Sequence, residues 1–195
     1  INKFFEYLIM FIQTETTPNP NSLKFLLEND ILESGSMEFS QISDCGESSL
    51  AKSLLQIDGI EKVFFGKNFI SINKSEYAWD QLKAPILKII SNHLSSGEKV
   101  VNSVTSKESL SSIIFQEDDY DIVKVIDSVL SSKVKPAIAQ DGGDVQFQEY
   151  KEGIVYLKLK GSCAGCPSAT QTLKNGIENL LKNKVPEVMR VEQVL

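Results

Sequence analysis

The sequence is poor in the residues from which metal sites and secreted disulfide frameworks are built. Its 195 residues include three cysteines, one histidine and one tryptophan. Two of the cysteines lie close together, at Cys163 and Cys166, and the third is distant, at Cys45. An odd number in this arrangement does not form the disulfide framework of a small secreted domain. We therefore expect an intracellular, reducing compartment.

An excess of basic charge and long apolar runs are also lacking. The formal net charge of -6 argues against nucleic-acid binding, because neutralising phosphates requires a basic face. No segment approaches the roughly 20 consecutive apolar residues that span a bilayer, so we expect no membrane partner. With 42% hydrophobic and 24% charged residues the composition is that of a globular protein, and the length is sufficient for two small domains.

The first half of the chain predicts an α+β domain over residues 10–98. Apolar and polar residues alternate on both sides of Thr17-Pro18-Asn19-Pro20-Asn21, which predicts a hairpin because each proline disfavours helix. Hydrophobic periodicity predicts strands at 11–15, 22–28, 37–39, 60–65 and 69–73 and helices at 47–57 and 79–94. Residues 1–9 precede the first strand pattern, so we interpret them as an upstream extension.

Residues 99–117 have no sustained period and predict a flexible linker. The second half, 118–195, predicts the order α-β-β-α-β, which suggests a three-stranded sheet covered by two helices. Its first helix should run to about Lys135, where Pro136 ends it, and its second should follow the cysteine pair and end at Lys184. The predicted fold class is therefore α+β, with two small α+β domains joined by a linker.

Cys163 and Cys166 lie in Gly161-Ser162-Cys163-Ala164-Gly165-Cys166-Pro167, between a predicted strand and a predicted helix. Two intervening residues let both sulfurs point at one centre. The unsatisfied N–H groups at a helix start favour thiolates. The spacing alone suits three kinds of site: a redox dithiol, a structural zinc site or an iron–sulfur cluster.

Both metal hypotheses require ligands from a second chain. A structural zinc usually has four protein ligands and a 4Fe-4S cluster usually has four thiolates, but the sequence has no second Cys-x-x-Cys pair. Cys45 is interpreted as an isolated thiol in a loop, and His93 as a helix-end residue without a metal role. A cluster shared by two protomers would lie at a symmetric interface. A thiol–disulfide oxidoreductase and a zinc-linked dimer are the alternatives.

Several motifs resemble the Nfu family of iron–sulfur cluster scaffolds. Residues 118–195 resemble its C-terminal NifU-like domain through Asp141-Gly142-Gly143-Asp144, the cysteine segment continued by Ser168, Leu173-Lys174-Asn175-Gly176-Ile177-Glu178 and Pro186-Glu187-Val188. Residues 10–98 resemble its N-terminal Nfu domain through Met10-Phe11-Ile12-Gln13-Thr14, Thr17-Pro18-Asn19-Pro20-Asn21-Ser22-Leu23-Lys24-Phe25 and Val63-Phe64-Phe65-Gly66.

The resemblance implies a carrier rather than an enzyme. It implies that Cys163 and Cys166 are the metal and cofactor ligands of a 4Fe-4S cluster that bridges a homodimer. An upstream cluster-assembly scaffold would supply the cluster, and apo iron–sulfur client proteins would receive it. For Asp141-Gly142-Gly143-Asp144 we expect a structural role that shapes a turn. The lack of a recognisable transit peptide and the 19 lysines against one arginine favour the bacterial cytoplasm, with the mitochondrial matrix as the alternative.

Overall fold

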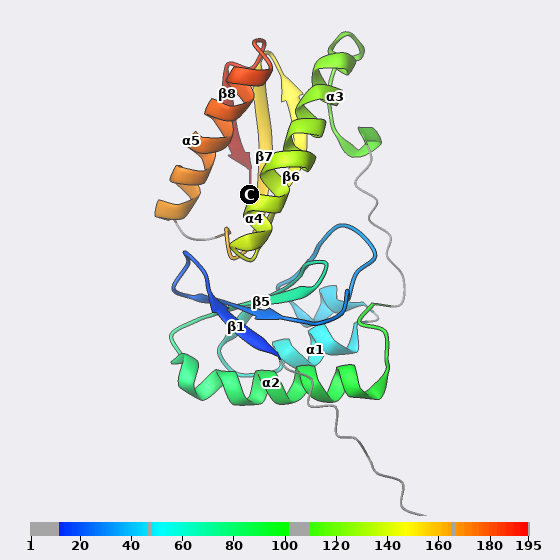
Figure 1. Ribbon diagram of the computed structural model, residues 1–195, viewed down its shortest axis with the longest axis vertical. Coiled ribbons are helices and arrows are strands. Elements are labelled where there is room, and N and C mark those ends of the chain that lie inside the picture. The colour runs from blue at the N-terminus through cyan, green and yellow to red at the C-terminus, as the bar shows by residue number, and fades with distance from the viewer. Residues whose placement is uncertain (1–11, 47, 102–109, 165–166, 195) are drawn as a thin grey trace, which may run out of the picture.

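The computed structural model describes residues 12–46, 48–101, 110–164 and 167–194. The expected upstream extension, 1–9, lies outside these residues. Two α+β domains follow one another along the long axis of the molecule (Figure 1). The predicted fold class is thereby confirmed.

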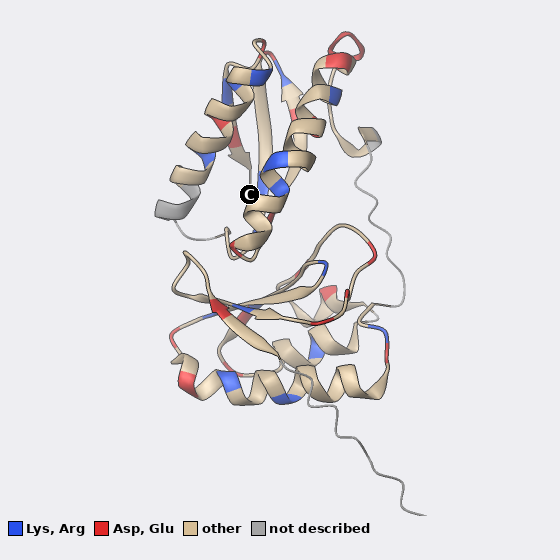
Figure 2. Cartoon of the chain, viewed as in Figure 1, with Lys and Arg blue, Asp and Glu red and all other residues tan. Residues whose placement is uncertain are grey.

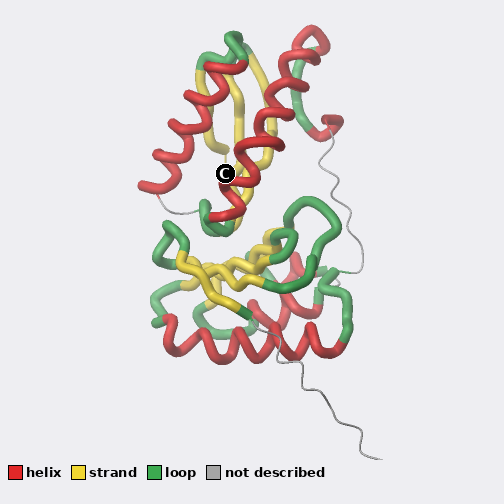
Figure 3. The backbone as a smooth tube through the Cα atoms, viewed as in Figure 1, coloured by secondary structure: helices red, strands yellow, loops and turns green. Residues whose placement is uncertain are grey.

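The N-terminal domain is a five-stranded antiparallel sheet with two helices on one face (Figure 3). Its strands run in the order β1-β2-β5-β4-β3. The elements are β1 (Gln13–Thr16), β2 (Ser22–Leu26), β3 (Met37–Phe39), η1 (Ile42–Cys45), α1 (Ser49–Leu55), β4 (Ile60–Phe65), β5 (Phe69–Lys74) and α2 (Trp79–Ser96). Each predicted strand and helix of this half is present, with ends shifted by a few residues.

Period-two alternation divides the side chains of this sheet between two faces. Phe25, Ile70 and Ile72 point towards α1 and α2 and are fully buried in the core. Helix α1 begins after Ser48, whose side chain accepts a hydrogen bond from the Ala51 N–H and so caps the helix. The residues between these core positions lie on the opposite face of the sheet, which is turned towards the C-terminal domain.

The C-terminal domain is a three-stranded sheet in the order β6-β7-β8, with its helices on one face (Figure 1). Its elements are α3 (Tyr120–Val129), η4 (Leu130–Val134), α4 (Lys135–Gln140), β6 (Gly143–Lys151), β7 (Ile154–Gly161), α5 (Pro167–Lys184) and β8 (Arg190–Val194). β6 and β7 form an antiparallel hairpin, whereas β8 lies parallel to β7 because α5 forms the crossover between them. Apart from the division of its first helix, the predicted α-β-β-α-β order is confirmed.

The prediction that Pro136 ends the first helix of this domain is wrong. The helical path continues through α4 to Gln140. Leu130–Val134, which only Lys135 separates from the proline, form a π-helical segment, and its wider turn accommodates the ring and the missing N–H of a proline. Pro136 is therefore the second residue of α4, inside a helical path that begins before it.

Both ends of the predicted linker pack against a domain. Val100 is buried in the N-terminal core, and Ile113 is buried in the C-terminal core. Ile114 adds two backbone hydrogen bonds to β6, donating to the Gln148 carbonyl and accepting from the Tyr150 N–H, each at 2.9 Å. The described parts of 99–117 are thus anchored, and the boundaries 99 and 117 stay predictions.

Charges of both signs are interspersed over the two domains in the described part of the chain (Figure 2). Among the described residues, no helix combines the length and the hydropathy that crossing a membrane requires.

The Glu178 carboxylate joins helix α5 to the edge strand β8. It accepts a hydrogen bond from the Lys182 ammonium at 2.6 Å and another from the Val191 N–H at 3.0 Å. These two donors, the lysine first, hold the pKa of Glu178 below its ordinary value. The side chain also satisfies a backbone donor of an edge strand, which would otherwise be open to pairing with another chain.

We predict that Glu178→Gln lowers the free energy of unfolding at pH 7 by about 0.5–1.5 kcal/mol, the usual contribution of one hydrogen bond. A carboxylate with a lowered folded-state pKa stabilises the fold above its unfolded value of about 4.3, and this contribution fades as the pH falls through the folded value. Urea unfolding of both proteins between pH 7 and pH 3 should therefore give converging curves at the acid end. A difference that is constant with pH would contradict this assignment.

Candidate functional site

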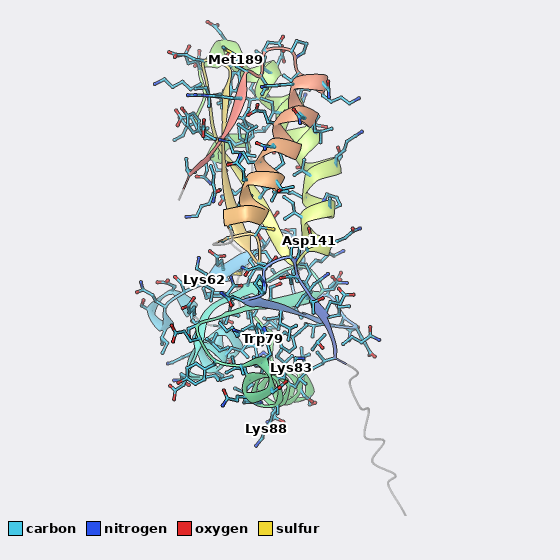
Figure 4. The ribbon with its side chains drawn as sticks, turned by 90° about the vertical axis from the view of Figure 1, so that its left-hand side faces the viewer. Lys62, Trp79, Lys83, Lys88, Asp141 and Met189 are labelled. Atoms are coloured by element: carbon cyan, nitrogen blue, oxygen red, sulfur yellow. The ribbon has the colours of Figure 1, made fainter. Side chains whose placement is uncertain are left out.

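Strand pairing brings the Asp141–Asp144 turn and the cysteine loop together. Gly143, the first residue of β6, pairs with Gly161, the last residue of β7. The turn before β6 and the loop after β7 therefore emerge at the same end of the hairpin. This end points at the N-terminal domain, as the position of Asp141 in Figure 4 indicates.

The turn and the loop are packed so closely that side chains at Gly143 and Gly161 would not fit between them. A methyl group added at Gly143 would lie 2.6 Å from the Cys163 sulfur and 2.8 Å from the Lys160 carbonyl oxygen. A methyl group at Gly161 would lie 2.7 Å from the Gly142 carbonyl oxygen. Gly161 also has φ of +67° and Gly142 of +80°, a region that favours glycine. Cys163 is thus held directly against a glycine backbone.

Hydrogen bonds fix the first half of the cysteine loop to this turn. The Ser162 N–H donates to the Gly142 carbonyl at 3.1 Å, and the Ser162 hydroxyl donates to the Asp141 carbonyl. The Ala164 N–H donates to the Gly161 carbonyl at 3.2 Å. Ser162 and Cys163 are accordingly buried, at 2% and 8% exposure.

The Asp144 carboxylate connects the same turn to the rest of the structure. It accepts from the Val145 N–H at 2.7 Å and from the Ser36 hydroxyl of the N-terminal domain at 2.5 Å. These bonds hold the Asp141–Asp144 turn and extend into the other domain, and the purely structural role expected for this segment stays a prediction.

Cys163 lines a pocket of about 400 Å³ that both domains form. Its lining residues are Pro18, Asn19, Asp141, Ser162, Cys163, Thr172 and Leu173. The last two belong to α5, so the pocket lies beside the helix that follows the loop, and this helix begins at Pro167 as predicted. Cys163 thus lies in a pocket that α5 also lines, and sulfur is a soft ligand for metals.

The structure places one of the two predicted ligands. Cys166 lies outside the described residues, so its position relative to Cys163 stays a prediction. The sequence indicated Pro18 and Asn19 as part of a turn and of a motif shared with the Nfu family, and their presence beside Cys163 was missed. No periodicity or spacing links them to a loop more than 140 residues away.

The remaining candidate ligands lie in the N-terminal domain. Cys45 was predicted in a loop, but it ends the 3-10 helix η1 and packs in the core at 3% exposure. Burial, with a smaller contribution from Asp44, raises the pKa of the Cys45 thiol, which opposes thiolate formation. His93 is buried near the end of α2, with its Nδ1 3.7 Å from the Glu98 carboxylate. These contacts suit structural roles for both side chains.

We predict that Gly143→Ala lowers the free energy of unfolding by about 1–3 kcal/mol, the usual cost of forcing an extra methyl group into a packed site. Gly176→Ala in α5 is the matched control, because a methyl group there meets no atom within 4 Å. It should raise stability by roughly 0.5–1 kcal/mol through helix propensity. Urea unfolding measures both, and equal stabilities for Gly143→Ala and the unaltered protein would contradict the close packing.

Two protein-family models match the chain, one on each domain. The model described as "Scaffold protein Nfu/NifU N terminal" matches residues 12–97, and the model described as "NifU-like domain" matches residues 126–192. The two matches are in chain order and together take in β1 to α2 and most of the C-terminal domain.

Similar proteins of known name occur in animals and plants. The human protein named "NFU1 iron-sulfur cluster scaffold homolog, mitochondrial" is 43% identical over 188 residues, which cover 95% of this chain and 72% of the human protein. The Arabidopsis thaliana protein named "NifU-like protein 4, mitochondrial" is 41% identical, over 94% of this chain and 66% of its own length. The solution structure of a Saccharomyces cerevisiae NifU-like protein aligns over 49% of this chain and 87% of its own, at 32% identity and a TM-score of 0.44. The two family models and the high identity over nearly the whole chain establish that this protein is a two-domain member of the Nfu/NifU family.

Proposed function

We propose that this protein is an iron–sulfur cluster scaffold and carrier, in which two chains hold one 4Fe-4S cluster through Cys163 and Cys166 of each. The observation that carries the proposal is the position of Cys163 in a pocket that α5 also lines, in a chain whose relatives are named iron–sulfur cluster scaffolds. In this proposal the cluster is cargo, and the chain releases it to another protein.

The number of thiols argues for a dimer. The sequence has three cysteines, and Cys45 is buried in the N-terminal core. Each chain therefore offers two thiolates from this loop, whereas a 4Fe-4S cluster usually takes four. Two copies related by a two-fold axis supply the full set.

A cluster bound in this way is suited to transfer. Each chain contributes ligands from a single short loop, so few bonds have to be exchanged for the cluster to leave. In transfer the iron–sulfur core moves intact, client thiolates replace the carrier thiolates, and the protons lost by the client thiols are balanced by those that the carrier thiolates regain. Apo iron–sulfur proteins are the proposed acceptors, and an upstream assembly scaffold is the proposed donor.

The names of the relatives support one of the two compartments that the sequence left open. The human and Arabidopsis proteins are both named mitochondrial. These names favour the mitochondrial matrix, the second of the two compartments expected from the sequence, over the bacterial cytoplasm.

We predict that anaerobic reconstitution with iron and sulfide gives a coloured protein with about two iron atoms per chain, as one 4Fe-4S cluster per two chains requires. Cys163→Ser and Cys166→Ser should each reduce cluster binding to background, because each removes two of the four thiolates from the dimer. Iron analysis and the visible absorption spectrum measure the result.

Cys45→Ala is the matched control, since it removes a buried thiol that has no proposed role, and it should keep the full iron content. A colourless protein after reconstitution would overturn the carrier proposal. In that case zinc in protein isolated without oxygen would support a zinc-linked dimer, and disulfide reduction by the apo protein that Cys163→Ser abolishes would support an oxidoreductase.

A further inference from the structure

The N-terminal sheet buries polar side chains on the face that has no helices. Lys24 and Ser71 lie on this face at 6% and 0% exposure, and Phe64 beside them is 1% exposed. In an antiparallel sheet with helices on one side, the other face commonly meets water. Here the C-terminal domain covers it, with the turn before β6 and the cysteine loop at the contact (Figures 1 and 4).

Hydrogen bonds across this contact converge on the backbone of that turn and loop. The Ser71 hydroxyl donates to the Gly142 carbonyl at 2.6 Å, and the Gly161 N–H donates to the Glu38 carboxylate at 2.7 Å. The Lys24 ammonium donates to the Gln140 carbonyl at 3.1 Å. The N-terminal domain thus pairs buried backbone groups that would otherwise depend on water.

Asn19 makes the contact nearest to the proposed cluster ligand. Its side-chain NH₂ donates to the Ser162 carbonyl at 3.1 Å, and this carbonyl belongs to the peptide bond that joins Ser162 to Cys163. The N–H of the same Ser162 residue is bonded to Gly142. Ser162 is therefore held from two sides, by the turn and by the other domain, directly before the cysteine.

The turn that carries Asn19 is itself preorganised. The Asn19 side-chain oxygen accepts from the Asn21 N–H at 3.0 Å, and the Thr17 hydroxyl accepts from the Asn19 N–H at 3.2 Å and donates to the Asn19 carbonyl at 2.9 Å. The adjoining prolines restrict the backbone further. At 6% exposure the Asn19 amide is a buried, fixed donor, so little conformational freedom is lost when it binds the loop.

We infer that Asn19 is a positioning residue for the Cys163 ligand and that the N-terminal domain forms one wall of the cluster site. This inference rests on the proposed cluster-binding function. Asn19 holds the peptide bond before Cys163, and with Pro18 it lines the pocket into which the cysteine faces. The N-terminal domain is in this view a component of the binding site, in addition to any role in recognising other proteins.

The first test uses the full-length apo protein, so that it does not depend on a cluster. A background of Cys45→Ala with Cys166→Ser leaves Cys163 as the single thiol, and iodoacetamide alkylation followed by mass spectrometry gives its reaction rate. Asn19→Ala should raise this rate about fivefold, the factor that corresponds to losing one ordinary hydrogen bond. Asn21→Ala is the matched control, because its exposed side chain bonds Lys74, and it should leave the rate unchanged.

A second variant separates positioning by Asn19 from docking of the whole domain. Ser71→Arg places a long side chain at a position whose hydroxyl oxygen already lies 2.6 Å from the Gly142 carbonyl oxygen. It should therefore force the domains apart. Small-angle X-ray scattering should then give a larger radius of gyration, and the alkylation rate should rise at least as much as in Asn19→Ala. A faster rate in Ser71→Arg with an unchanged rate in Asn19→Ala would overturn the assignment of Asn19.

The third test uses the cluster-loaded protein with both loop cysteines present. The Asn19→Ala protein should bind the same amount of iron as the unaltered protein. The visible circular dichroism of its cluster should differ, and the half-life of its cluster under a chelator should be about fivefold shorter. The Asn21→Ala protein should match the unaltered protein in all three measurements. An unchanged spectrum and half-life would overturn the positioning role and leave the proposed function intact. Failure of the unaltered protein to bind a cluster would instead overturn the proposed function, and the alkylation rates would still decide whether Asn19 holds the loop.

Discussion

The contact on which the site depends is that of Cys163 with the bare backbone of Gly143. Since a single methyl group on this glycine would lie 2.6 Å from the sulfur, the cysteine can occupy its place only while the residue opposite has no side chain. The pairing of Gly143 with Gly161 and the bond from the Ser162 N–H to Gly142 hold the loop at this distance. A side chain held on a strand pair in this way inherits the rigidity of the sheet, and α5 lines the same pocket through Thr172 and Leu173.

The second constraint is the polar face of the N-terminal sheet. The hydroxyl of Ser71, the ammonium of Lys24 and the carboxylate of Glu38 all bond backbone atoms of the C-terminal domain. Backbone recognition of this kind depends on the shape of the turn and loop and little on their side chains. The two domains therefore form a continuous structure around Cys163, although each domain has its own core.

The sequence was informative wherever structure follows from local pattern. Alternation and turn residues placed the strands, and Pro167 marked the start of α5. Local reasoning failed at Pro136, because the effect of a proline depends on the turn before it and Leu130–Val134 forms a π-helical turn. It failed for Cys45 because its burial arises from the tertiary packing of the N-terminal core. It could not find Asn19, since a bond to Ser162 joins residues that only the folded chain brings together.

The central claim is that each chain supplies half of a cluster site and that two chains complete it. Native mass spectrometry of the anaerobically reconstituted protein tests this claim most directly, because it weighs the chains and the cluster together. The account predicts a species with the mass of two chains plus one cluster of four iron and four sulfide ions, and apo chains when Cys163 is replaced by serine. A cluster bound to a single chain, or two chains joined with no iron, would contradict it.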